Sequence, residues 1–170
     1  HQGALVHAGA LPIFLPTARN AFGMIGAVDW DAWDEGYLRD QIRKNPLVKD
    51  SERAKAARPF RLACIQLATY DGTIYNVRKV MEKIGHLCDY VLWDEAWIGY
   101  NAFHPLFEDH SPMRIEALSP DMPGLFSTQS VHKQGAGFSQ ASQIHKRDAH
   151  IRGQKRYVEH KRFNESFLMA

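Results

Sequence analysis

The 170-residue sequence has few cysteines, no long apolar run and no strong excess of either charge. Cys64 and Cys88 are its two cysteines. Because each lies in or beside an apolar run, we expect small buried thiols rather than a disulfide framework. Two cysteines without an expected disulfide fit a reducing, cytoplasmic setting. No apolar run is long enough to cross a bilayer and no secretory signal opens the sequence, so a membrane partner is not expected.

The two signs of charge are nearly balanced, with a formal net charge of +2 and 24% charged residues. Nothing in that balance requires a nucleic acid or an acidic membrane as partner. The basic stretch at residues 145–163 is interpreted as a solvated face or a lid over an anionic ligand, ahead of RNA binding. We expect its basic side chains to lie in solvent, with contact to a neighbouring subunit as the second interpretation. These residues are Lys146, Arg147, Arg152, Lys155 and Arg156.

The nine histidines show no metal-ligand spacing with cysteine or carboxylates, so no metal site is predicted. An apolar fraction of 45% is enough for one sizeable core. The sequence begins without a methionine and stops inside a helical pattern, which leads us to expect a piece of a longer polypeptide.

Apolar patterning predicts alternating strands and helices. Strands are expected at residues 11–15, 60–68, 89–93 and 125–130, with a further candidate at 137–145. Helices are expected at 34–44, at 77–88 with Asn76 as N-cap, and in the first residues up to Gly9. Strand, helix, strand, connection and strand in this order favour an α/β sheet with right-handed crossovers.

Polar residues follow three of the predicted strands. Asp94 comes directly after the strand at 89–93, Lys133 follows the strand at 125–130, and a polar turn at 69–72 follows the strand at 60–68. Ligands of open parallel sheets bind beyond the carboxyl ends of the strands. We therefore expect these residues to meet at one edge of the sheet.

A carboxylate and a lysine at one sheet edge have two interpretations. A buried salt bridge is the simpler one. The other is a pyridoxal phosphate site, which needs a lysine amine for the cofactor aldehyde and an acid to keep the pyridine nitrogen protonated. Glu95, next to Asp94, is expected on the opposite face by strand alternation, in a structural role.

Two long segments make the second interpretation specific: "DEAWIGYNAFHPLF" and "QSVHKQGAGFSQASQIHKRDAHIRGQ". They resemble the bacterial ornithine/lysine/arginine decarboxylases, which depend on pyridoxal 5'-phosphate and have the aspartate-aminotransferase fold. "RPFRLACIQLATYDGTIYN" and "IGHLCDY" match the same family in the same order, so the resemblance covers essentially the whole chain. "QSVHKQ", "SQIHK" and "HIRGQ" are most similar to the ornithine branch.

The resemblance implies a role for each matching residue. Lys133 matches the lysine that binds the cofactor aldehyde, and Asp94 matches the partner of the pyridine nitrogen. The remaining matches are cofactor contacts: His132 and Ser130 near the phosphate, Ala96 against the ring, Trp97 near the phenolic oxygen, and Thr69 with its "TYDG" turn beside the site. Gly135 departs from the ornithine branch, which has a larger polar residue there.

The resemblance also implies an architecture and an activity. Residues 1–170 are expected to form a segment of a three-layer αβα, mostly parallel cofactor-binding domain. The family's phosphate loop and ring-stacking histidine match nothing here, so His1 receives no role, and the smaller C-terminal domain is absent too. The expected reaction is decarboxylation of L-ornithine to putrescine in polyamine biosynthesis.

Two alternatives remain open: decarboxylation of lysine or arginine, and a non-catalytic relative used as an assembly domain. Because enzymes of this fold build their sites between subunits, a dimer or higher homo-oligomer is expected. The segment alone is expected to be inactive.

Overall fold

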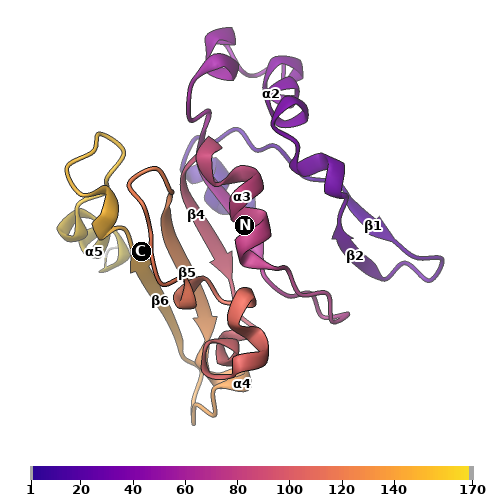
Figure 1. The fold of residues 1–170 in the computed structure, drawn as a ribbon, viewed down its shortest axis with the longest axis vertical. Coiled ribbons are helices and arrows are strands. Elements are labelled where there is room, and N and C mark those ends of the chain that lie inside the picture. The colour runs from indigo at the N-terminus through magenta and orange to yellow at the C-terminus, as the bar shows by residue number, and fades with distance from the viewer. Residues whose placement is uncertain (1, 169–170) are drawn as a thin grey trace.

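The computed structural model describes residues 2–168 and is built around a four-stranded sheet in the order β3-β4-β5-β6 (Figure 1). The strands are β3 (Phe60–Gln66), β4 (Cys88–Asp94), β5 (Gly124–Ser130) and β6 (Ser142–Arg147). The first three are parallel and β6 is antiparallel to β5. The expected α/β class with a mostly parallel sheet is confirmed, and β6 is the further strand that the 137–145 pattern suggested.

Helix α3 (Val77–Ile84) is the crossover between β3 and β4. Asn76 caps its first turn, with the side-chain oxygen accepting from the Lys79 amide at 3.0 Å. The apolar side of the helix buries Val77, Val80 and Ile84 against the sheet. The expected helix of 77–88 is too long, because a 3-10 turn at Gly85–Leu87 precedes β4.

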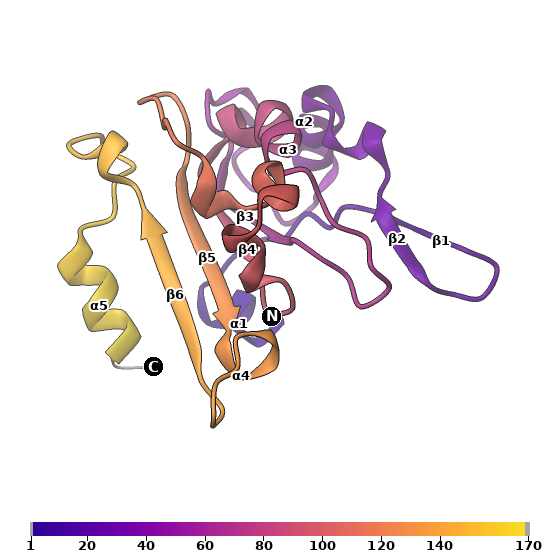
Figure 2. The same ribbon diagram turned by 60° about the horizontal axis from the view of Figure 1, so that its bottom comes forward.

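The core lies between α3 and one face of the sheet. Val91, Trp93 and Leu125 alternate inward and are fully buried. The opposite face is partly covered by α5 (His160–Leu168), which lies on the other side of the sheet from α3 (Figures 1 and 2). There the Phe163 ring stacks on Phe126 with centroids 5.3 Å apart. These layers agree with the expected αβα arrangement.

Strand β3 lies at the edge of the described sheet, and one of its two faces is open to solvent. Leu62 and Cys64 are exposed on that side, whereas Ile65 is buried. The prediction of a buried Cys64 is therefore wrong, and that of a buried Cys88 is confirmed. An apolar run does not by itself distinguish an edge strand from a central one, which is why the sequence was misleading here.

The N-terminal third lies outside the main sheet. Helix α1 (Gln2–His7) ends before Gly9, whose φ of +58° suits a helix end. A hairpin of β1 (Thr17–Arg19) and β2 (Ile25–Val28) then projects from the body (Figure 2). Helix α2 (Glu35–Lys44) begins after Asp34, which caps it through the Tyr37 amide at 3.0 Å. The helix expected at 34–44 is confirmed.

The strand predicted at 11–15 is wrong. Those residues are irregular, and strand pairing begins only at Thr17. Pro12 and Pro16 flank the stretch and cannot donate to a β-ladder. Its apolar residues therefore form no strand of the sheet.

The basic segment after β6 is partly buried, contrary to the expected solvated face. The guanidinium of Arg156 donates to the carbonyl oxygens of Pro120 at 2.6 Å and Met122 at 2.8 Å. Arg147 likewise donates to the carbonyls of Pro112, Met113 and Ile115. Irregular chain between β4 and β5 has carbonyls without partners in a ladder, and these arginines satisfy them.

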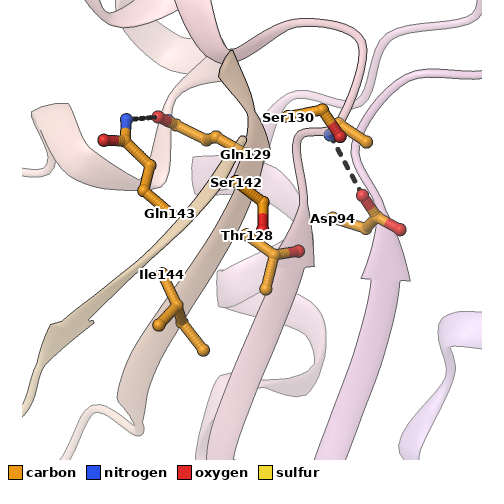
Figure 3. Close-up of a pocket in the computed structure, with 8 residues that line it drawn as sticks. Asp94, Thr128, Gln129, Ser130, Ser142, Gln143 and Ile144 are labelled. Atoms are coloured by element: carbon orange, nitrogen blue, oxygen red, sulfur yellow. Dashed lines mark hydrogen bonds between the residues drawn. The ribbon is translucent and has the colours of Figure 1, made fainter. Parts of the chain in front are cut away.

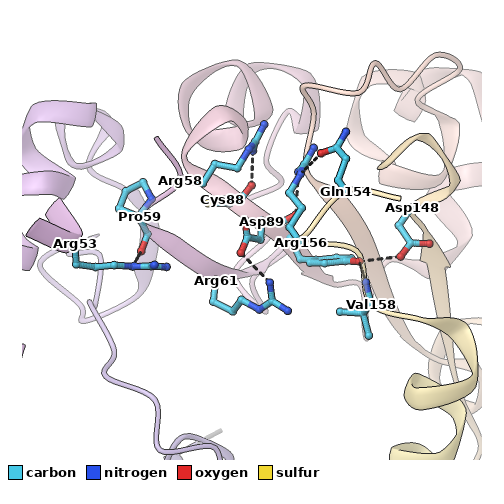
Figure 4. Close-up of polar contacts among 11 residues, drawn as sticks. Arg53, Arg58, Pro59, Arg61, Cys88, Asp89, Asp148, Gln154, Arg156 and Val158 are labelled. Carbon is cyan, nitrogen blue, oxygen red and sulfur yellow. Dashed lines mark hydrogen bonds and ion pairs between the residues drawn. The ribbon is translucent and has the colours of Figure 1, made fainter. Parts of the chain in front are cut away.

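Lys146 is also buried rather than solvated. Its Nζ lies 2.5 Å from Asp148 Oδ2, and both side chains are nearly inaccessible. The Tyr90 hydroxyl donates to the same carboxylate at 2.9 Å and accepts from the Val158 amide (Figure 4). This network ties the approach to α5 onto the sheet. Arg152 and Lys155 are exposed, as expected.

Among residues 2–168, no helix is both long and apolar enough to cross a membrane.

Candidate active site

An open pocket of about 290 Å³ lies where β4 and β5 end and β6 begins (Figure 3). Asp94, Ala96, Thr128 and Ser130 contribute to it from the β4 and β5 side. Ser142 and Ile144 contribute from β6. The pocket therefore occupies the carboxyl edge of the parallel strands, the location that ligands favour in open α/β sheets.

Asp94 is the last residue of β4 and is half-buried in this pocket. It pairs in register with Thr128 of β5, and the two side chains lie on the same side of the strands (Figure 3). Its Oδ1 accepts the Ala96 amide at 3.0 Å, which turns the chain away from the strand. That turn brings the small Ala96 side chain to the same pocket.

Glu95 lies on the opposite face, as strand alternation predicted. It is fully buried, and its Oε2 accepts from Ser127 Oγ at 2.7 Å and Gln129 Nε2 at 2.5 Å. Burial raises the pKa of its carboxyl, while hydrogen bonds from Ser127 and Gln129 act in the other direction. Glu95 thus supports β5 from behind the pocket.

Lys133 lies in α4 (Val131–Gln134), a single helical turn directly after β5. Its Nζ is 4.9 Å from the centroid of the Trp97 ring, in cation–π geometry. The side chain is half-buried and does not itself line the 290 Å³ pocket. Lys133 and Trp97 therefore form a pair next to the pocket that contains Asp94 and Ala96.

Ser130 and His132 differ in placement. Ser130 lines the pocket, whereas His132 is exposed and its Nδ1 lies 2.9 Å from the Ala141 carbonyl oxygen and 3.2 Å from the Ala141 amide nitrogen. These contacts hold His132 against the loop that leads into β6. Of these two sequence-predicted residues, the structure brings only Ser130 into the pocket lining.

Thr69 lies in the turn after β3, outside the pocket lining but at the same sheet edge. The turn is closed by the Thr69 amide to the Thr73 carbonyl at 2.9 Å and by the Gly72 amide to the Thr69 carbonyl. Tyr70 extends from this turn, and its ring meets Trp97 edge-on at 5.0 Å. The turn is thus connected to the Lys133–Trp97 pair through Tyr70.

The chemistry of these groups fits a cofactor that carries an aldehyde, a ring nitrogen and a phenolic oxygen. A carboxylate and a primary amine are both present at the edge. In addition, the Trp97 indole Nε1 is buried and has no hydrogen-bond partner among residues 2–168. A buried donor without a partner is costly unless a ligand supplies an acceptor. Within the same residues, no cluster of His, Cys, Asp and Glu could hold a metal ion.

No function of Gly135 follows from the sequence, but the structure shows a steric reason for a glycine there. A Cβ at this position would lie 2.9 Å from the Val131 carbonyl oxygen, and the Gly135 amide donates to that same oxygen at 3.1 Å. The next residue, Ala136, has a left-handed φ of +56°. Gly135 therefore permits a tight turn immediately after α4.

Thr128, Ser142 and Ile144 line the pocket but were not predicted. The pairing of Thr128 with Asp94 could have been suggested by aligning the strand ends. The pocket positions of Ser142 and Ile144 in β6 could not have been predicted, because the sequence pattern does not specify which strand they pair with. Tyr70 was noted only as part of the turn.

The whole chain, residues 1–170, matches the family model described as Orn/Lys/Arg decarboxylase, major domain. It is 58% identical to the inducible ornithine decarboxylase of Escherichia coli (strain K12), covering 99% of this chain and 22% of that protein. It is 57% identical to the ornithine decarboxylase of Haemophilus influenzae, with 99% and 23% covered.

Among solved structures, lysine decarboxylase A from Pseudomonas aeruginosa aligns with a TM-score of 0.84 and 32% identity, covering 98% of this chain and 21% of that one. The chain thus spans about a fifth of the length of the relatives it matches. On this match over its full length, the chain belongs to the Orn/Lys/Arg decarboxylase family, through the major domain.

Proposed function

We propose that the chain is the cofactor-binding segment of a pyridoxal 5'-phosphate-dependent decarboxylase that converts L-ornithine to putrescine and carbon dioxide. The observation that carries the proposal is the placement of Asp94 and the Lys133–Trp97 pair at one sheet edge. The choice of ornithine is supported by identities of 58% and 57% to named ornithine decarboxylases, against 32% to a lysine decarboxylase.

Four residues would hold the cofactor ring. Asp94 would sit against the pyridine nitrogen, where its negative charge keeps a proton on that atom. Lys133 Nζ would bind the aldehyde carbon, and the unpartnered Trp97 Nε1–H would donate to the phenolic oxygen. Ala96 is small enough to leave room for the ring. When bound, the cofactor supplies an electron sink for the bonding pair released as carbon dioxide departs.

Hydroxyl groups at the same sheet edge would contact the cofactor phosphate. Ser130 lines the pocket and offers a hydroxyl, and Thr69 offers one from the turn after β3. His132 now contacts Ala141, so a phosphate contact would require its ring to turn from that loop. The proposal therefore ranks His132 behind Ser130 as a phosphate ligand in this arrangement.

The protein's own proton carriers at the edge are few. Lys133 Nζ lies over the face of the Trp97 ring, 4.9 Å from its centroid. With the cofactor bound, the Lys133 amine would lie beside it and could deliver a proton to the carbon that loses its carboxyl group. The role of Lys133 is thus first to bind and then to move a proton.

Assembly is part of the proposal, because a fifth of a relative's length supplies only part of a site. The remaining chain, and a second copy of the protein, would add the missing phosphate and substrate contacts. We therefore expect the complete protein to be a cytoplasmic dimer or higher homo-oligomer.

The test uses the full-length protein and compares Lys133→Ala with Lys155→Ala, in which an exposed lysine is removed. The parent and the control should show the absorbance of a lysine-bound cofactor and release carbon dioxide from ornithine faster than from lysine or arginine. Lys133→Ala should lose both signals. A preference for lysine or arginine would correct the substrate, and a colourless, inactive parent would favour the non-catalytic alternative.

A further inference from the structure

The Lys133 amine rests on the Trp97 ring at 4.9 Å from the centroid. The orientation of that indole therefore affects where the amine lies. It also affects the direction of the buried Nε1–H, a donor that has no acceptor among residues 2–168. A side chain that fixes the indole plane acts on both groups at once.

Tyr70 provides a contact that can fix this plane. Its ring meets the Trp97 ring with centroids 5.0 Å apart and an interplanar angle of 73°, a T-shaped pair. Edge-to-face geometry is favourable because the positive edge of one ring meets the negative face of the other. Tyr70 and Lys133 thus both contact the same indole.

Tyr70 is 75% exposed, so its own burial cannot hold it in place. Its turn can. The Thr73 amide donates to Thr69 Oγ1 at 3.2 Å, the Thr69 amide donates to the Thr73 carbonyl at 2.9 Å, and the Gly72 amide donates to the Thr69 carbonyl at 3.2 Å. The backbone that carries Tyr70 is therefore closely constrained.

The same turn is anchored to the hairpin of β1 and β2. Asp71 Oδ2 accepts the Ile25 amide at 2.9 Å, and the Tyr75 hydroxyl accepts the Val28 amide at 2.7 Å. Residues that are about 46 positions apart are joined in this way. The hairpin thus holds the turn that carries Tyr70 through two hydrogen bonds.

We propose that Tyr70 is a positioning residue, whose ring holds the Trp97 indole so that its face supports the Lys133 amine and its Nε1–H remains directed to a ligand. Asp71 assists by anchoring the turn to the hairpin. The inference rests on the proposed function, because it takes the ligand to be the cofactor that Lys133 binds.

The experiment measures pyridoxal phosphate binding to full-length apoprotein by absorbance, together with the absorbance maximum of the bound form. Tyr70→Phe keeps the ring, whereas Tyr70→Ala and Tyr70→Leu remove it. The matched control is Tyr100→Ala, since Tyr100 is also exposed and also meets a ring, Phe107, edge-on at 6.2 Å.

Tyr70→Ala and Tyr70→Leu should bind the cofactor about two- to tenfold more weakly than the parent, the range expected for loss of one aromatic pair. Tyr70→Phe and Tyr100→Ala should match the parent. In combination with Trp97→Phe, the Tyr70→Ala loss should shrink, because the ring that Tyr70 holds has changed. Asp71→Ala should act in the same direction as Tyr70→Ala.

Parent-like binding by Tyr70→Ala and Tyr70→Leu would overturn the inference. So would an equal loss in Tyr70→Phe, which would assign the effect to the hydroxyl. Additive losses with Trp97→Phe would show that Tyr70 acts elsewhere. If the parent itself fails to bind the cofactor, the proposed function fails first, and that result is distinguishable from the others.

Discussion

Asp94 and Glu95 are neighbours in the sequence, yet they have opposite environments. Asp94 is half-buried in the pocket, whereas Glu95 is fully buried behind β5. This division could be predicted from the sequence, because side chains alternate along a strand. The contacts of the Glu95 carboxylate could not be predicted, because its partners Ser127 and Gln129 are more than 30 positions away in the sequence.

Removing the Asp94 carboxylate should separate cofactor binding from turnover. In full-length Asp94→Ala, cofactor binds, if more weakly, but kcat for ornithine should fall about a hundredfold or more, because a charge that stabilises the reacting state is gone. Steady-state kinetics with Asp40→Ala, which removes a surface carboxylate on α2, provide the control. A near-parental kcat would contradict the role of Asp94.

Glu95 should make stability depend on pH in a defined direction. Because burial raises its pKa in the folded protein, the folded state keeps its proton to a higher pH than the unfolded state. Its contribution to stability is therefore lost as pH rises from the ordinary carboxyl pKa to the raised value. In urea unfolding of full-length apoprotein, Glu95→Gln should lose this slope. Parallel pH curves for variant and parent would refute the assignment.

At the scale of elements, the sequence predicts best where local chemistry is decisive. Asn76 and Asp34 mark the starts of α3 and α2 because their side chains cap free amides. The sequence fails where tertiary context decides. Residues 11–15 are as apolar as a strand but form none, and Cys64 is exposed because it lies on a face of β3 that is open to solvent.

The buried arginines were also unpredictable, because their partners are carbonyls of irregular chain. Arg58 donates to the carbonyl oxygens of Cys88 and Asp121, and its contact with Cys88 is drawn in Figure 4. Arg156 donates to the carbonyl oxygens of Pro120 and Met122. Both arginines therefore fix the chain that leads into β5. Nothing in the spacing of a basic segment distinguishes such a clamp from a solvated face.

Arg156→Ala should destabilise the protein by at least about 2 kcal/mol, because several buried carbonyls lose their donor. Arg152→Ala, at an exposed position of the same segment, should be close to neutral. Chemical unfolding of both full-length variants makes the comparison. Equal stability of the two would mean that Arg156 is solvated in solution, as the sequence first suggested.

At the scale of the whole molecule, the fold class and the edge that carries the candidate site follow from strand order alone. Three parallel strands deliver Thr69, Asp94 and Lys133 to one side, as expected from the sequence. A strand near β6 was expected, but its antiparallel pairing with β5 and its pocket residues, Ser142 and Ile144, could not be predicted, because strand pairing depends on long-range contacts. The proposed cofactor and substrate rest on the family resemblance and not on the amino-acid composition.

The segment alone should bind the cofactor far more weakly than the full-length protein. It spans about a fifth of its relatives, so most of the contacts of a complete site would come from elsewhere. Absorbance titration of residues 1–170 against the full-length protein measures the difference. Equal affinity would mean that the described edge holds the cofactor without help.

The central claim is that Lys133 binds the cofactor aldehyde, and one measurement tests it most directly. Full-length protein is loaded with pyridoxal phosphate, reduced with borohydride, digested and mapped by mass spectrometry. The account predicts one pyridoxyl-modified peptide, with the modification on Lys133 and absent when excess aldehyde-trapping reagent precedes reduction. Modification of another lysine, such as Lys146 or Lys155, with Lys133 unmodified, would contradict it.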